Sequence, residues 1–132
     1  MKLKVYIASP YTNGWAADNV RRQLEAKHIL LDHSFVPFAP LENHFAELYK
    51  HRSEKEWFAW DLEWLKVCDI MVRIRPTDGD GVEIPSIGAD IEEKTAEEEG
   101  LLVFNFKSLS ELKSWAITVN KKDLIKQKNG NS

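Results

Sequence analysis

Cysteine and long apolar runs are the scarcest features of this sequence. The single cysteine, Cys68, has no partner for an internal disulfide, which is typical of a protein in a reducing compartment. No window approaches the roughly 18 apolar residues that a membrane helix needs. Residues 1–9 carry a short apolar run that meets a proline, without the longer apolar region of a secretory signal. We therefore expect a cytoplasmic protein with no membrane partner.

An excess of positive charge is also missing. The chain has 18 basic and 21 acidic residues, a formal net charge of −3, so nothing draws it as a whole toward a nucleic acid polymer or an anionic membrane. Its 132 residues suffice for one domain with a core of its own. We expect a single domain over residues 1–127 and a disordered tail over residues 128–132.

The motifs of several cofactor and metal sites are absent. Without GxGxxG or GKS/GKT, the sequence excludes the usual NAD and P-loop sites. His33, His44 and His51 lack the spacing of zinc ligands, and no cysteine pair accompanies them. Residues 78–81 read DGDG, but the alternating ligands and distal glutamate of a calcium loop do not follow. We expect no metal and no cofactor, and interpret residues 75–84 as a flexible lid.

Short apolar stretches alternate with helical patterns along the chain. We expect strands at residues 3–9, 34–38, 69–74 and 101–106, and helices at residues 15–31, 54–67, 86–99 and 109–126. This alternation predicts an α/β, three-layer Rossmann-like or flavodoxin-like sandwich with a parallel sheet of four or five strands. Ligands of such folds bind beyond the carboxyl ends of the strands. The segments expected around one crevice are residues 9–13, 37–44, 75–86 and 105–107.

One acidic residue of the helix expected at residues 86–99 stands apart from the others. On a helical wheel of about 100° per residue, an apolar arc runs from Ile87 at zero past Ile91 to about 180°. Glu92 lies near 140°, inside this arc. The acids that face water on the same wheel are Asp90, Glu93 and Glu97. Because an inward glutamate without a partner is rare, Glu92 either works in a site or packs its stem at the rim with its head in water.

A similar wheel singles out Asp61 in the tryptophan-rich segment at residues 57–68. Asp61 lies near 40° from Trp57, in the middle of an apolar arc that also holds Trp60 and Trp64. An aspartate in such surroundings must be hydrogen-bonded or serve a ligand. The tryptophans themselves are more typical of a core or a subunit interface.

Three further polar residues lie at strand and helix positions. Tyr6 is in the middle of the first expected strand, where its hydroxyl needs a partner. Asp69 opens the third strand, where a polar residue commonly satisfies loop amides. Ser86 is a good helix N-cap, and the small residues after it leave the backbone N–H groups open to a phosphate or hydroxyl of a ligand.

These segments together resemble a known superfamily. KVYIASPYT, WFAWDLEWLKVCDIMV and PSIGADIE follow one another over residues 2–104 in the order found in the nucleoside 2-deoxyribosyltransferase-like superfamily. That superfamily includes deoxyribosyltransferases, deoxynucleoside 5′-monophosphate N-glycosidases and small uncharacterised relatives. The resemblance implies that Glu92 is the nucleophile and that Tyr6 holds it. It also implies a catalytic aspartate at Asp69, with Asp61 as a second candidate for protonating the leaving base.

The resemblance also suggests a substrate-binding set. Six positions before the nucleophile, transferases often have an aspartate that contacts the base, whereas this chain has Ser86. The monophosphate glycosidases have a serine there that contacts phosphate, which favours hydrolysis over base exchange. For His44 a surface or packing role competes with substrate contact. The residues expected to bind substrate are Ser9, Tyr11, Asp61, Ser86, Gly88 and His44.

The expected function is cleavage of the N-glycosidic bond of a 2′-deoxynucleoside or its 5′-monophosphate, by hydrolysis or base transfer, through a covalent glycosyl-Glu92 intermediate. The alternative is a non-catalytic nucleotide-binding or sensing module on the same fold, which an outward Glu92 would favour. Members of the superfamily usually complete their sites across a subunit interface, so a homodimer or higher homo-oligomer is implied.

Overall fold

Four short parallel strands form the centre of the molecule, in a computed structural model that describes residues 2–130. Their bounds are β1 (Lys4–Ala8), β2 (Val36–Phe38), β3 (Ile70–Ile74) and β4 (Leu102–Phe106). The strand order is β2-β1-β3-β4 and every pair is parallel. All five residues of β3 are buried, as in sheets that helices cover on both faces. The α/β fold expected from the sequence is confirmed, with four strands.

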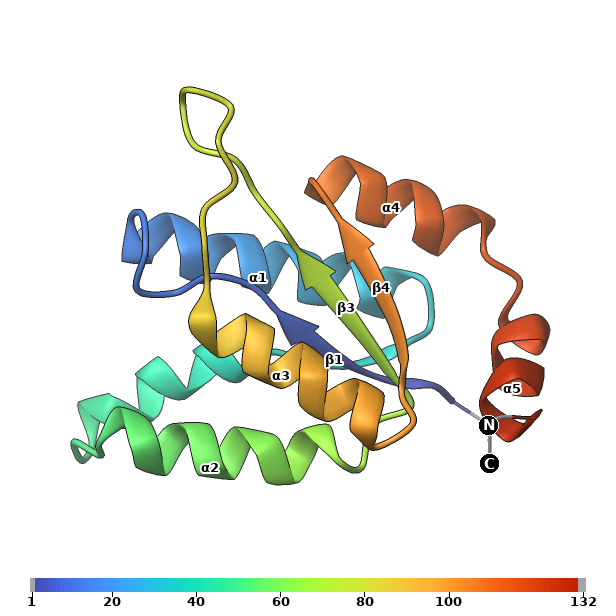
Figure 1. The fold of residues 1–132 in the computed structure, drawn as a ribbon, viewed down its shortest axis with the longest axis horizontal. Coiled ribbons are helices and arrows are strands. Elements are labelled where there is room, and N and C mark those ends of the chain that lie inside the picture. Colours follow the sequence, from blue (N-terminus) through green and yellow to red (C-terminus); the bar gives the residue numbers. More distant parts are fainter. Residues whose placement is uncertain (1, 131–132) are drawn as a thin grey trace.

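Helices cover both faces of the sheet (Figure 1). They are α1 (Ala16–Asp32), the 3-10 helix η1 (Pro40–Leu48), α2 (Glu54–Leu65), α3 (Ile87–Glu98), α4 (Leu109–Thr118) and α5 (Lys121–Gly130). Alternate side chains of β1 face opposite layers. Val5 and Ile7 pack in a core with residues of α1 and α4. Tyr6 and Ala8 pack in a second core with residues of α2 and α3.

The direction of the chain across the sheet reverses at β1. The chain runs from β1 to β2 on one side and then crosses to β3 on the other. In open parallel sheets a ligand crevice forms at such a reversal, outside the carboxyl ends of the strands. The loop after β1 and the amino end of α3 meet at this edge (Figure 1), so the topology favours a site there.

The chain ends in two helices where the pattern had predicted one helix over residues 109–126. Val119 has an extended backbone (ψ 140°) that stops α4, and the Asn120 side chain accepts hydrogen bonds from the N–H groups of Lys122 and Asp123. An asparagine in this position is a helix N-cap. Because α5 continues to Gly130, residues 128–130 of the expected tail are helical, and residues 131–132 lie outside the described part.

The loop over residues 75–84 extends beyond the carboxyl end of β3 as a narrow projection (Figure 1). A bridge between Thr77 and Glu83 closes it, and Gly81 provides the left-handed turn at its tip (φ +80°). Within residues 2–130 no helix is both long and apolar enough to cross a membrane.

Candidate active site

A cavity of about 590 Å³ opens at the predicted edge of the sheet. Its walls come from the loop after β1, from η1, from α2 and from the first half of α3. The volume lies within the range of small-molecule sites. None of residues 75–84 lines this cavity, so the loop expected to be a lid does not cover it in this structure. The predicted residues that line it are Ser9, Tyr11, His44, Asp61, Ser86, Gly88 and Glu92.

Glu92 forms the deepest carboxyl group of the site. Glu92 is only 7% exposed. The hydroxyl of the fully buried Tyr6 donates a hydrogen bond to Glu92 Oε2. Burial raises the pKa of Glu92 to about 8, while the Tyr6 hydrogen bond acts in the opposite direction. Burial, followed by the charge of Glu92, raises the pKa of Tyr6 well above its usual value. Tyr6 is therefore a neutral hydrogen-bond donor beneath Glu92.

Small side chains on α3 bring Glu92 to this place. The buried positions of α3 are Ala89, Glu92 and Ala96, which follow one another at helical spacing and allow the helix to lie close to the sheet. Ser86 caps the helix by accepting a hydrogen bond from the Ala89 N–H at 3.1 Å. The wheel located Glu92 correctly on the inward side. It was wrong about the centre of the buried arc, because Ile87 and Ile91 are 76% and 45% exposed.

Asp61 provides a second carboxyl group in the same cavity. The Asn43 side-chain amide donates a hydrogen bond to Asp61 Oδ1 at 2.9 Å. Burial raises the pKa of Asp61 to about 7, against the effect of that hydrogen bond. The tryptophan surroundings expected for Asp61 were partly wrong, because Trp60 and Trp64 are 41% and 46% exposed and stack against Phe38 instead.

Asp69 does not reach the cavity, which corrects the expectation that it is catalytic. It precedes β3 and therefore lies at the amino end of that strand, whereas the cavity lies at the carboxyl ends. Its Oδ2 accepts a hydrogen bond from the backbone N–H of Lys4 at 2.9 Å. Asp69 thus has the structural role that its position at a strand start commonly indicates.

Two buried amides of α1, which the sequence analysis missed, hold the loops around the cavity. Gln23 donates to Ser9 Oγ at 2.9 Å and accepts from the Leu41 N–H at 2.8 Å, joining the loops after β1 and β2. One turn earlier, Asn19 donates to the carbonyl groups of Tyr11 and Asn13 at 2.9 and 2.7 Å. The available signal was the spacing of these two polar residues by four positions on one helix face.

Tyr11 and His44 form an aromatic pair at the cavity wall. Their ring centroids are 4.1 Å apart with an interplanar angle of 32°. Burial lowers the pKa of His44, which keeps its ring uncharged at neutral pH. The pair provides a flat, neutral surface of the kind on which a heterocyclic base can stack.

A buried arginine also escaped the sequence analysis. Arg73 of β3 is 3% exposed and forms ion pairs with Asp90 at 2.6 Å and with Glu93 at 3.3 Å. The wheel had placed both acids in water, and Glu93 is in fact only 20% exposed at its side chain. The available signal was a single charged residue inside an otherwise apolar strand, IMVRI.

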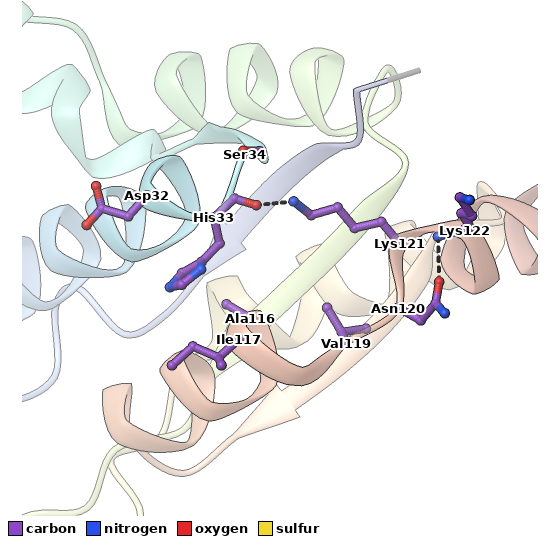
Figure 2. Close-up of a pocket in the computed structure, with 9 residues that line it drawn as sticks. All are labelled: Asp32, His33, Ser34, Ala116, Ile117, Val119, Asn120, Lys121 and Lys122. Carbon is purple, nitrogen blue, oxygen red and sulfur yellow. Dashed lines mark hydrogen bonds between the residues drawn. The ribbon is translucent and has the colours of Figure 1, made fainter.

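A second, open hollow lies between the end of α1 and the junction of α4 with α5 (Figure 2). The Lys121 side chain crosses it and donates to the carbonyl oxygen of His33. The Asn120 side chain is used in capping α5. The side chains of Lys121 and Asn120 in this hollow are thus already used in hydrogen bonds that hold the fold. Among residues 2–130, no group of three or more histidine, cysteine, aspartate or glutamate side chains is placed to hold a metal ion.

Comparisons with known proteins give matches at the level of structure alone. No protein-family model matches the chain, and no curated protein matches it. A 2-deoxyribosyltransferase from the psychrotolerant bacterium Bacillus psychrosaccharolyticus is similar over 92% of this chain and 95% of its own, with a TM-score of 0.66 and 21% identity. A 2-desoxiribosyltransferase from Leishmania mexicana is similar over 79% of this chain and 63% of its own, with a TM-score of 0.60 and 15% identity.

The chain has the fold of the 2-deoxyribosyltransferases. The fold implied by the sequence resemblance is therefore confirmed over nearly the whole chain. At 15% to 21% identity the likeness concerns the 2-deoxyribosyltransferase fold and leaves activity to be argued from the site itself.

Proposed function

We propose that the protein cleaves the N-glycosidic bond of a 2′-deoxynucleoside or its 5′-monophosphate, through a covalent glycosyl-Glu92 intermediate. The observation that carries the proposal is the buried carboxyl group of Glu92, held by Tyr6, in one cavity with a second carboxyl group on Asp61. Two carboxyl groups with different partners are what glycosyl transfer requires. The proposed compartment is the reducing cytoplasm, where the buried thiol of Cys68 stays free.

The first half of the proposed reaction forms an ester. A carboxylate oxygen of Glu92 attacks C1′ of the sugar on the face opposite the base, as the charge of an oxocarbenium-like sugar develops. The bond between C1′ and the base nitrogen breaks, and its electron pair leaves with the base. Asp61 gives its proton to the departing base.

The second half releases the sugar. In hydrolysis, a water oxygen attacks C1′, Glu92 leaves as a carboxylate, and Asp61 takes the proton of the water. In transfer, the nitrogen of a second base takes the place of water. Ser86, in place of the base-contacting aspartate expected for a transferase, favours hydrolysis.

The two carboxyl groups set the pH dependence of the proposed reaction. The reaction needs Glu92 ionised and Asp61 protonated, yet burial in the empty cavity raises the pKa of Glu92 to about 8 and that of Asp61 to about 7. The reactive arrangement is then the less populated of the two singly protonated forms. Because the groups share one cavity, a rate profile reports the pKa values of the pair, and we expect a bell centred between about pH 7 and 8.

The remaining lining residues fit the substrate in the proposed mode. The backbone N–H groups at the start of α3, beyond Ser86, suit the 5′ oxygen or phosphate, and Ser9 lies on the same cavity wall. The paired rings of Tyr11 and His44 suit the base. Gly88 adds no side chain to this wall, although a Cβ there would make only an ordinary contact of 3.8 Å with the Phe58 ring.

The proposal is tested by incubation with the four deoxynucleosides and their 5′-monophosphates, with released base measured by chromatography. We expect release by the wild type and a loss of roughly 10⁴-fold or more in Glu92→Gln. The matched control is Glu97→Gln on the exposed side of the same helix, which keeps wild-type activity. Wild-type release that persists in Glu92→Gln would disprove the role of Glu92.

A sensing module is the second candidate function. It is favoured by the raised pKa of Glu92. A protonated carboxyl group can bind a sugar hydroxyl, but it does not attack C1′. Calorimetry with the same eight compounds separates the two functions. Tight binding by wild type and Glu92→Gln alike, without base release, supports the sensor.

We also propose that the protein is a homo-oligomer, as the resemblance implies. Large apolar side chains are exposed at the end of η1, where Phe45 is 62%, Leu48 86% and Tyr49 95% exposed. Such a cluster at a surface is more typical of an interface than of a solvated helix.

A further inference from the structure

Arg73 lies on the same face of the sheet as Tyr6. In the pairing of β1 with β3, Tyr6 is opposite Met71 and Ala8 is opposite Arg73. Side chains two residues apart on a strand share a face, so Arg73 points into the layer of α2 and α3 together with Met71. Arg73 therefore lies two residue pairs closer than Tyr6 to the edge where the cavity opens.

Two acids of α3 hold the Arg73 guanidinium under the segment that carries Glu92. One nitrogen lies 2.6 Å from Asp90 Oδ1 and another lies 3.3 Å from Glu93 Oε1. These acids are two residues before and one residue after Glu92, so they bracket it along the helix. Burying an arginine this completely costs free energy unless its charge is paired with other groups.

The two acids do not cancel the charge of Arg73. Glu93 is shared, because Arg75 also contacts its Oε1 at 3.3 Å. The Asp90 side chain is 64% exposed, so water screens its charge more than that of the buried arginine. The cluster holds three acids for two arginines, since Arg75 also pairs with Glu83 at 3.0 Å, yet Arg73 still favours the ionised form of Glu92.

The other charged or ionisable groups around Glu92 come from each element packed against it. Tyr6 of β1 is a neutral donor, Asp61 of α2 is a second acid that disfavours the ionised form of Glu92, and Arg73 of β3 favours that form. His44, Glu54 and Lys55 line the same cavity. Among the groups with a direct electrostatic effect on Glu92, Arg73 alone is a cation.

We propose that Arg73 is a positioning residue, a buried counter-ion that favours the ionised form of Glu92 and so raises the share of molecules in which the proton shared with Asp61 resides on Asp61. Its catalytic meaning rests on the proposed function, whereas its electrostatic effect on Glu92 does not. The ion pairs hold the guanidinium in place, and its charge raises the population of the form in which Glu92 attacks and Asp61 gives the proton.

The test compares Arg73→Gln, Arg73→Lys and Asp90→Asn with the wild type. The ionisation of Glu92 is followed without substrate by NMR of ¹³C-labelled glutamate carboxyl groups, with Glu92→Gln assigning the signal. We expect the midpoint for Glu92 to move up by about 1 pH unit or more in Arg73→Gln. It stays near the wild-type value in Arg73→Lys, and it moves down in Asp90→Asn because Arg73 loses an anion.

If Arg73 only holds α3 in place and has no electrostatic effect on Glu92, a different result is expected. Loss of a clamp would lower stability in both Arg73→Gln and Asp90→Asn, without opposite shifts of the Glu92 midpoint. Unchanged midpoints in both variants would overturn the proposal. If Arg73→Gln does not fold by circular dichroism, Asp90→Asn still decides, since its exposed side chain leaves the core intact.

The pH profile of base release separates the counter-ion role of Arg73 from the glycosidase function. With an active wild type, the basic limb, which the higher pKa of Glu92 sets, moves in the same directions as the NMR midpoints, by about 1 pH unit or more in Arg73→Gln. With an inactive wild type, shifted midpoints leave the counter-ion standing and the glycosidase function fails. An active wild type in which neither the Glu92 midpoint nor the basic limb shifts supports the glycosidase function and overturns the counter-ion role of Arg73.

Discussion

At the scale of single residues, the sequence predicted which carboxyl group faces inward, but not its ionisation. Glu92 was found by periodicity because that pattern depends only on spacing along α3. Its pKa depends on burial, on Tyr6 and on Arg73, which come from distant parts of the chain. The role given to Asp69 came from the resemblance alone and failed because a residue that opens a parallel strand lies at its amino end, away from the cavity at the carboxyl ends.

Glu92 makes the stability of the fold depend on pH. Its pKa is raised from 4.5 to about 8 by burial, so the folded protein keeps a proton that the unfolded chain releases. The associated stability is fully present below pH 4.5 and is lost as the pH rises to about 8, by about 1.4 kcal/mol for each pH unit.

Glu92→Gln removes this loss, because glutamine carries no ionisable group. We expect its free energy of unfolding to exceed that of the wild type by a gap that widens from pH 5 to pH 9, reaching a few kcal/mol. Urea denaturation at pH 5, 7 and 9 measures the gap. The exposed Glu97→Gln is the control and keeps a constant difference from the wild type. A gap for Glu92→Gln that stays constant would count against a raised pKa.

At the scale of elements, α1 acts as a polar brace for the loops of the site. Helical periodicity predicted α1, but no rule of periodicity assigns partners to its buried amides. Gln23 connects Ser9, after β1, with Leu41, after β2, and these loops meet only because β1 and β2 are neighbours in the sheet. A buried polar group with both of its hydrogen bonds made is what keeps such loops in one arrangement.

Gln23→Met keeps the length of the side chain and removes both hydrogen bonds. The Leu41 N–H then lacks its partner, and we expect a loss of about 1–3 kcal/mol in the free energy of unfolding. With an active wild type, KM rises more than kcat falls, because Ser9, which we propose binds the substrate, loses its partner while Glu92 stays in place. Glu25→Met on the exposed side of α1 is the control. Unchanged stability in Gln23→Met would show that the brace is dispensable.

At the scale of the whole molecule, the alternation of strands and helices was sufficient to predict the architecture. Each strand is short and apolar enough to be read locally, and parallel connection follows from the helix between successive strands. The break between α4 and α5 was not predicted, because Val119 continues the apolar pattern and only its backbone departs from the helix. For Trp60 and Trp64 the sequence left both a core and a subunit interface open, and both side chains are partly exposed, since composition does not show what covers a helix.

The exposed end of η1 gives the prediction for assembly. Leu48 and Tyr49 are 86% and 95% exposed, and burial of one such leucine stabilises an interface by about 1.5–3 kcal/mol. We expect light scattering to give a mass of at least twice 15.3 kDa for the wild type, and Leu48→Lys to shift the protein toward the single-chain mass. Ile117→Lys is the matched control, because Ile117 is 58% exposed on α4, in the opposite layer. A single-chain mass for the wild type would contradict the assembly, whereas dissociation by Ile117→Lys with a stable Leu48→Lys would move the interface to α4.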